Sequence, residues 1–395
     1  MTDGQKLFIS LLSAYFNNEK STPCNLNGMA EMLSLAKEHN LTAVIVQALK
    51  QCGIFSNLGE KEKSALNQAV GYTVQASAKC DSLFDEVSGL LENAKITYTP
   101  VKGCVLKSLY PDSALRTSGD VDFVVDERSI ERIKNMLCAS GFEYDENAHT
   151  PTFNKYSTHA EFHTCFEGMN GKVLDFGVDS FESCTDYCRR LKAEEHILYM
   201  ICHIAKHLAN GGAGVRMLAD IDSVVRRLNV NENRVLRLCA QNGAGAVCTA
   251  VFSLCSDWFN TPFKGHYALS ENTPLYSDLS SVILTGGTFG FKNGVMGTRR
   301  LKNAIGKRGK ASFGAKVKAL LNFVFIKPRD VRQYYSYSRK HAFLIPAAYF
   351  NRLFNAFFSH FGKTKQTVSE IFNNGEEAEL QARLLCELEI ERKKQ

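Results

Sequence analysis

The most constraining feature of this sequence is a pair of aspartates two residues apart in an otherwise apolar run, Asp120-Val-Asp122-Phe-Val-Val125. The β-branched and aromatic residues predict a β-strand, in which side chains alternate between two faces. Asp120 and Asp122 therefore share one face, and Val121 and Phe123 point into the core. Two carboxylates on one face repel each other and lose hydration, so we expect a positive partner. A divalent hard cation such as Mg²⁺ fits, because it takes carboxylates together with substrate phosphates.

A second strand is expected just upstream, over residues 96–101. It runs through Lys102-Gly103 into residues 104–110, whose apolar positions have helical spacing. A strand that turns through glycine into a helix leaves backbone N–H groups unpaired where the helix begins, and these suit an anion such as phosphate. We therefore expect phosphate-binding backbone and metal-binding carboxylates to face one cleft.

These residues carry a resemblance to a known family. Lys102-Gly103, Tyr110-Pro111, Arg116 and Gly119-Asp120-Val-Asp122 resemble the KG…YP…R…DIDLLV pattern of the uncharacterised nucleotidyltransferase family, part of the polymerase-β-like nucleotidyltransferase superfamily. The resemblance covers residues 95–225 clearly and the helical remainder loosely. It implies transfer of a nucleoside monophosphate from an NTP, ATP by default, to an unknown acceptor hydroxyl by two-metal catalysis with Mg²⁺ or Mn²⁺. It also implies catalytic metal ligands at Asp120 and Asp122, and nucleotide binding by Lys102, Gly103, Arg116 and Gly119.

The superfamily pattern includes a third acidic residue on a later strand. Two more strands are expected over residues 159–166 and 172–178, joined by a glycine-containing hairpin turn. In the first, Glu161 and His163 alternate onto one face. The family's third carboxylate lies in an acidic-apolar-His triplet, so the resemblance assigns Glu161 as the third catalytic and metal-binding carboxylate. Asp175 on the second strand is the reserve candidate, because no histidine follows it at the matching position.

A long helix is expected over residues 193–209. Its histidines His196, His203 and His207 are spaced seven and four residues apart, so they share a face. We expect this helix to line the cleft, with His207, and His203 beside it, contacting substrate. The open alternative is that they are ordinary core histidines.

Residues 211–222 resemble the family's second block, a glycine-rich loop followed by a helix that carries arginine and aspartate. Arg216 and Asp220 are four residues apart on that helix. They form either a surface ion pair of small energetic worth or a base or ribose contact in the cleft, and the spacing leaves both open. The resemblance places Arg216 and Asp220, like His207, among the nucleotide-binding residues.

The rest of the chain is expected to be mostly helical. Apolar residues at three- and four-residue spacing predict helices over 6–16, 26–38, 43–51 and 60–91, and further helices over 230–285. The expected fold is α+β, a small mixed β-sheet nucleotidyltransferase core with flanking helices and a mostly helical C-terminal half. We expect an N-terminal helical segment over 1–94 that packs on the sheet, the core over 95–190, a helical domain that closes the cleft over 191–285, and a basic, aromatic helical region over 286–395.

The C-terminal region is strongly basic. Residues 292–340 contain 14 Lys or Arg and one acidic residue, giving +13 in a chain whose net charge is +6. Residues 343–361 follow with a phenylalanine stripe at helical spacing. This combination predicts a partner that is anionic, either nucleic acid or a membrane surface, through residues 292–361. The open alternative is a solvated basic face with the stripe packed on the domain.

Composition narrows the class of protein. No run of about 18 apolar residues occurs, so no transmembrane helix is expected, and the N-terminus has no apolar signal-peptide core. The 13 cysteines are odd in number and include no C-x-x-C pair, which favours reduced thiols. We expect a cytoplasmic protein, with peripheral membrane attachment as an alternative. The second hypothesis for function is a catalytically inactive binding module recruited by the basic C-terminal region.

Overall fold

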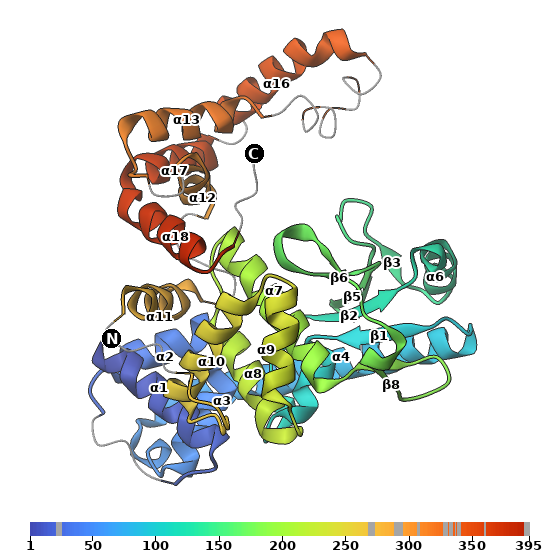
Figure 1. Cartoon of the computed structure of the whole chain (residues 1–395), viewed down its shortest axis with the longest axis vertical. Coiled ribbons are helices and arrows are strands. Elements are labelled where there is room, and N and C mark those ends of the chain that lie inside the picture. The colour runs from blue at the N-terminus through green and yellow to red at the C-terminus, as the bar shows by residue number, and fades with distance from the viewer. Residues whose placement is uncertain are drawn as a thin grey trace.

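The computed structural model describes residues 1–20, 26–267, 273–287, 295–305, 309–326, 331, 335, 337, 341–358 and 361–390. The helices are α1 Asp3–Phe16, α2 Met29–Glu38, α3 Thr42–Gln51, α4 Glu60–Asn93, α5 Gly103–Leu106, α6 Ile130–Ala139, α7 Ala193–Asn210, α8 Val215–Arg227, α9 Glu232–Gln241, α10 Gly245–Phe259, α11 Pro274–Gly286, α12 Val295–Ala304, α13 Phe313–Val324, α16 Ile345–Phe358, α17 Phe361–Asn373 and α18 Gly375–Glu387. The strands are β1 Tyr98–Val101, β2 Asp120–Val125, β3 Glu143–Tyr144, β4 Thr152–Lys155, β5 Thr158–His163, β6 Phe166–Glu167, β7 Val173–Leu174, β8 Phe181–Ser183 and β9 Arg189–Leu191. Figure 1 shows the sheet on one side of a helical body, with the C-terminal helices forming a separate lobe.

The main sheet has the order β1-β2-β5-β4-β3. β2 is antiparallel to β1 and parallel to β5, and β4 is antiparallel to both β5 and β3. This mixed sheet among many helices confirms the predicted α+β fold. The parallel pairing fixes the site, because it sets Asp120 opposite His159 and Asp122 opposite Glu161.

One face of this sheet is an apolar core. Phe123 of β2 stacks on Phe162 of β5 with ring centroids 5.3 Å apart, and on Phe84 of α4 at 5.8 Å. The helices that cover this face are α4 and α6, through Leu83, Val87 and Leu91 of α4 and Ile133 and Leu137 of α6. Because strand side chains alternate, the aspartates, Glu161 and the histidines of β5 all lie on the opposite face.

The other helices form a second core. Helices α1, α2 and α3 pack on one another, and α1 also contacts α10. Buried Asp222 of α8 accepts two hydrogen bonds from Arg226, which also donates to the carbonyl of Phe259 in α10 and to Asn17 after α1. The expectation that the N-terminal helical segment packs on the sheet holds for α4, which covers the sheet, whereas α1, α2 and α3 pack on one another and join the helical body through the contact of α1 with α10.

The C-terminal lobe has a small core of its own. It consists of Leu301, Ala304, Ile305, Ala319, Ile371, Ala378 and Ala382. The ammonium of buried Lys302 in α12 donates to the carbonyl of Ala209 in the last turn of α7, where the helix dipole favours a cation. Arg383 of α18 pairs with Asp278 of α11 at 2.7 Å. The lobe is thus joined to the body at α7 and α11.

Two local expectations differ from the structure. The strand expected over residues 159–166 ends at His163, and the hairpin forms instead between β6 and β7, in a separate two-stranded sheet. That places Asp175 just after β7 and exposed, away from the main sheet.

Within the described part of the chain, no helix is both long and apolar enough to cross a bilayer. Of the predicted basic segment, residues 292–294, 306–308, 327–330, 332–334, 336 and 338–340 lie outside the described residues.

Candidate functional site

A cluster of carboxylates and imidazoles lies across β2 and β5. Asp120, His159 and Glu161 have potential ligand atoms within 4.8 Å of one another, and so do Asp122, Glu161 and His163. Glu161 belongs to both groups because the parallel register places it beside Asp122 and one pleat from Asp120. The three carboxylates proposed from the sequence therefore lie together, whereas Asp175 does not join them.

Asp122 is the buried centre of this cluster, with 1% of its surface exposed. Its Oδ1 atom lies 2.6 Å from Nζ of Lys102 and 2.8 Å from Nε2 of His163. Burial opposes ionisation, but the hydrogen bond from His163 and the charge of Lys102 prevail and lower the pKa of Asp122 to about 2. The carboxylate is ionised at neutral pH and already has a cation beside it.

Lys102 reaches Asp122 from an unusual backbone conformation. It occupies the turn between β1 and α5 with φ 56° and ψ −126°, in the half of conformational space that favours glycine. Such a conformation costs on the order of 1–3 kcal/mol and persists only where the surroundings hold it. The ion pair with Asp122 is one interaction that holds it, and the expected role of Lys102 on phosphate requires the ammonium to leave this pair.

Gly103, the next residue, is needed for close packing. A Cβ atom built on Gly103 would lie 2.2 Å from Oγ of Ser118 and 2.9 Å from Nη1 of Arg116. Ser118 in turn donates a hydrogen bond to the carbonyl of Asp120 at 3.1 Å. The absence of a side chain at residue 103 thus lets the segment before β2 pack on the start of α5.

Arg116 and Asp220 form a buried, two-pronged ion pair. Nε and Nη2 of Arg116 each lie 2.8 Å from an oxygen of Asp220, and the hydroxyl of Tyr110 donates to the same carboxylate at 2.8 Å. Arg116 and Asp220 are each 5% exposed. The sequence left open a surface ion pair between Arg216 and Asp220. This pair is not formed, because the carboxylate of Asp220 is bound by Arg116 and Tyr110 instead. This arrangement ties the segment before β2 to α8.

Arg216 points into the same space without a carboxylate partner among the described residues. Its Nη1 donates to the carbonyl and the hydroxyl of Thr117 at 3.1 and 3.0 Å. Burial, and the nearby charge of Arg116, lower its pKa. A partly desolvated guanidinium with remaining donors is suited to an anionic ligand.

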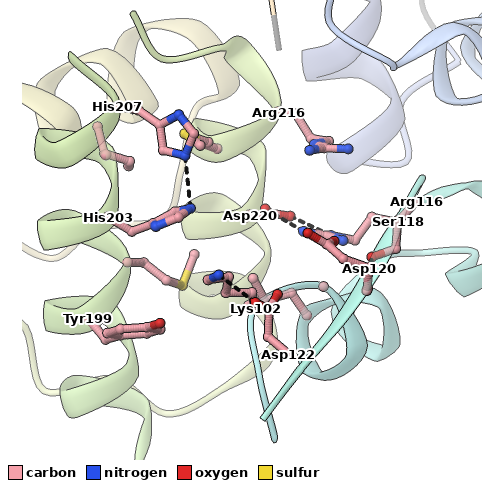
Figure 2. Close-up of a pocket in the computed structure, with 15 residues that line it drawn as sticks. Lys102, Arg116, Ser118, Asp120, Asp122, Tyr199, His203, His207, Arg216 and Asp220 are labelled. Carbon is pink, nitrogen blue, oxygen red and sulfur yellow. Dashed lines mark hydrogen bonds and ion pairs between the residues drawn. The ribbon is translucent and has the colours of Figure 1, made fainter. Parts of the chain in front are cut away.

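The space between these groups is a cavity of about 250 Å³. Its wall includes Lys102, Gly103, Arg116, Ser118, Asp120, Asp122, Tyr199, Met200, His203, Ile204, His207, Arg216, Met217 and Asp220. Figure 2 shows the α7 side chains Tyr199, His203 and His207 along one side, with Asp120 and Asp122 across from them and Arg216 at the upper edge. One wall is thus aromatic and aliphatic, and the other is charged.

The two histidines of that wall are neutral. Nε2 of His203 lies 3.1 Å from Nε2 of His207. Burial lowers the pKa of His207 to about 4 and lowers that of His203 well below its usual value. At neutral pH the pair offers imidazole donors and acceptors, and no charge, to a ligand. This is the cleft position expected for both residues.

His196, about two helical turns before His203 on α7, is not part of the cavity wall. It is 5% exposed, and its Nε2 atom has no hydrogen-bond partner among the residues that the structure describes. Burial lowers its pKa to about 4, against the attraction of nearby Asp220. His196 is therefore an ordinary core histidine, which was the alternative left open by the sequence.

Some residues of the site were not found from the sequence. His159 was missed, although the alternation that selected Glu161 and His163 includes it. Ser118 and Tyr199 gave no distinguishing pattern. Conversely, Gly119 was expected from the sequence to bind nucleotide, but it is exposed and does not border the cavity. Its carbonyl accepts a hydrogen bond from Thr158 at 3.0 Å.

The donor atoms of the cluster suit a divalent metal. Carboxylates are the ligands that Mg²⁺ and Mn²⁺ prefer, and Asp120, Asp122 and Glu161 provide them on one face. Each group also contains an imidazole, a donor common to transition-metal sites. Lys102 lies where a cation next to Asp122 would lie, so the residues fit a metal if this ammonium moves aside or shares the carboxylate.

Comparison with known proteins identifies one family. A family model described as "Uncharacterised nucleotidyltransferase" matches residues 27–260, a span that contains the main sheet, the carboxylate cluster and the whole cavity wall. No curated protein and no solved structure matches the chain.

Proposed function

The chain belongs to the uncharacterised nucleotidyltransferase family, and on that premise we propose that it transfers a nucleoside monophosphate from an NTP to an acceptor hydroxyl with the aid of Mg²⁺ or Mn²⁺. The observation that carries the proposal is the register of β2 and β5. It places Glu161 in ligand range of both Asp120 and Asp122. A buried carboxylate beside two others costs free energy unless a cation neutralises the group, and this cost favours a site that binds a cation.

Asp120, Asp122 and Glu161 are proposed as the catalytic metal ligands, with His159 and His163 as companions. When bound, the metal would supply charge neutralisation at the triphosphate and at the attacking and leaving oxygens. Within this chain, Glu161 is the carboxylate proposed to accept the acceptor's proton, since its side chain is 27% exposed, whereas Asp122 is buried and paired. His163 hydrogen-bonds Asp122 and so orients it.

The cavity supports a division of the nucleotide between its two walls. Arg216 and Lys102 are the cations that we assign to the phosphates, since both reach the cavity and Arg216 has no carboxylate partner in the described chain. Tyr199 and the neutral His203 and His207 form a wall suited to a base or ribose. We assign positioning roles to Arg116 and Asp220, because they satisfy each other.

The test is calorimetric binding of ATP, GTP, CTP and UTP in the presence of Mg²⁺. Wild type is compared with the Asp120→Asn/Asp122→Asn variant, and Asp175→Asn is the matched control because that carboxylate is exposed and off the sheet. We expect Mg²⁺-dependent binding of at least one NTP, kept by the control and lost by the double variant. Binding that the double variant keeps would place the nucleotide elsewhere.

A second outcome of this test concerns the alternative function. If folded wild type binds no NTP with Mg²⁺ or Mn²⁺, the chain is a binding module that keeps the nucleotidyltransferase fold without turnover. The pairing of Lys102 with Asp122 is the observation that gives this alternative weight, because an internal cation at this carboxylate competes with a metal.

A further inference from the structure

Helix α16 presents a row of phenylalanines to solvent. Phe350, Phe354 and Phe358 recur every four residues, which places them on one face of the helix. Their side chains are 74%, 51% and 74% exposed. Phe343 before the helix and Phe361 after it are also exposed. Single exposed apolar residues are ordinary, but a row of aromatic rings along one helix marks an interaction surface.

The opposite side of α16 is the one that packs on the protein. The Tyr349 hydroxyl donates to the carbonyl of Ile326, its ring lies 5.8 Å from that of Phe325, and Arg352 donates to the carbonyl of Phe323 at 3.3 Å. These contacts hold α16 against the end of α13. The phenylalanine row is thus not packed on the domain, which was the open alternative from the sequence.

The surroundings of the row are positively charged. In the described residues from 309 to 369 there is no Asp or Glu. The exposed cations there are Lys310, Lys318, Lys363 and Lys365, on or beside α13 and α17. Their charge is complementary to an anionic surface, to which lysines near the headgroups are attracted.

The arrangement favours lipid over nucleic acid. Proteins that bind single strands interleave cations with stacking rings along a groove, so that phosphates and bases are contacted together. On α16 the cation is Arg352, and it lies on the side that faces α13. The row itself is apolar, as in helices that lie in the plane of a membrane interface. With 14 residues, α16 is about 21 Å long, which suits a surface orientation.

We propose that α16 docks on the surface of an anionic bilayer, with Phe350, Phe354 and Phe358 inserted at the headgroup–acyl boundary and the flanking lysines near the headgroups. In Figure 1, α13 and α16 lie at the top of the C-terminal lobe, above α12, α17 and α18. The inference does not depend on the proposed function, since it concerns residues outside the matched span.

The experiment is co-sedimentation of the full chain with vesicles of phosphatidylcholine alone and of phosphatidylcholine mixed with phosphatidylglycerol. The variant is Phe350→Ser/Phe354→Ser/Phe358→Ser. The matched control is Tyr72→Ser/Val74→Ser, which removes exposed apolar side chains from α4. Because the three rings contribute most of the inserted apolar area, we expect the triple variant to bind anionic vesicles at least about tenfold more weakly, and the control to bind like wild type. Binding by wild type should also weaken as salt is raised.

Several outcomes would overturn the proposal. They are failure of folded wild type to bind anionic vesicles, equal binding by the triple variant, and binding that depends on neither lipid charge nor salt. Light scattering on the same proteins tests a second copy as the occupant, which a dimer that the triple variant loses would establish. Binding of a single-stranded oligonucleotide that the triple variant loses would identify nucleic acid instead. Circular dichroism checks that each variant is folded.

Discussion

The ammonium of Lys102 lies 2.6 Å from Oδ1 of Asp122, so a carboxylate proposed to bind metal is paired with a cation of the chain itself. The pair is nearly buried, and the Lys102 backbone has a positive φ that only surrounding contacts can maintain. His163 donates a second hydrogen bond to the same carboxylate oxygen. Occupation of Asp122 by a metal therefore competes with a preformed internal contact.

Replacing Lys102 by Met should strengthen metal binding. The variant leaves Asp122 buried without its ammonium, so we expect the Mn²⁺ affinity to rise about tenfold or more and the melting temperature to depend more steeply on Mn²⁺. Mn²⁺ titration calorimetry and thermal unfolding measure the two effects. Lys155→Met, which removes a lysine paired with Glu86 at 2.5 Å, is the control. Weaker Mn²⁺ binding by the Lys102 variant would show that the ammonium supports the metal site.

Breaking the buried pair of Arg116 and Asp220 should destabilise the fold. Each single variant, Arg116→Met or Asp220→Leu, leaves one buried charge without its partner and should lower the free energy of unfolding by about 3–5 kcal/mol. The double variant should lose much less than the sum, because no unpaired charge remains. Urea unfolding of the four proteins measures the coupling. Additive losses, together with loss of NTP binding by Arg116→Met alone, would instead make Arg116 a phosphate ligand.

Gly103→Ala should disturb the site through Ser118. The new Cβ would meet Oγ of Ser118 at 2.2 Å, so the segment before β2 must move. We expect a loss of about 1–3 kcal/mol in unfolding free energy and weaker NTP binding, since overpacked sites shift their backbone. Adding Ser118→Ala removes the closest atom and should restore much of both. If the single variant has the unfolding free energy and the NTP affinity of wild type, the close packing at this turn contributes to neither stability nor binding.

Arg216→Met should separate binding from stability. Arg216 makes hydrogen bonds to Thr117 but no ion pair in the described chain, so its loss should leave the unfolding free energy within about 1 kcal/mol. If it contacts the triphosphate, NTP binding should weaken about tenfold to a hundredfold. Calorimetry and urea unfolding on one preparation give both values. Unchanged NTP affinity would remove Arg216 from the nucleotide site.

Acid should destabilise the protein partly through His196. Burial lowers the pKa of His196 to about 4 in the folded protein, whereas the unfolded chain has the usual value near 6.5. Between these values the unfolded state binds more protons, so stability falls as pH drops from 6.5 to 4 and does not change further on this account below pH 4. The contribution is up to about 3 kcal/mol.

The pH dependence is measured as the difference between wild type and His196→Phe in urea unfolding at each pH. His203 and His207 contribute with the same sign in both proteins, because burial lowers their pKa as well, and so they cancel in the difference. Asp220 and Arg116, the charged groups that act on His196, are also common to both. A difference that does not vary between pH 4 and 6.5 would contradict a neutral, buried His196.

Much of the local structure was predictable because it depends on short-range patterns. Helical spacing identified α1, α3, α4 and α7 to within a few residues, and period-two alternation identified β2 and the shared face of Asp120 and Asp122. Helix α6 is preceded by a short 3₁₀ turn, at the start of which the side chain of Asp126 accepts a hydrogen bond from the backbone N–H of Arg128. Caps depend on the exact path of the chain, which patterns locate only within a few residues.

The site was predictable only where one strand carries it. Asp120 with Asp122, and Glu161 with His163, are pairs within single strands, and alternation alone gives each pair a common face. The pairing of β2 and β5 as parallel neighbours depends on the whole sheet. The contacts of Glu161 with both aspartates depend on it in the same way. His159 joined the cluster by the same register.

The sequence by itself determined the elements, the face of β2 that carries the carboxylates and the family, because these follow from local spacing and from a motif within residues 102–122. The tertiary structure decided the partners. Arg116 pairs with Asp220, 104 residues away, instead of leaving it to Arg216 on the same helix. Lys102 turns to Asp122, and the phenylalanines of α16 stay exposed. Each outcome depends on which side chains from distant segments lie close to one another in the folded protein. The spacing of residues in the sequence does not give these distances.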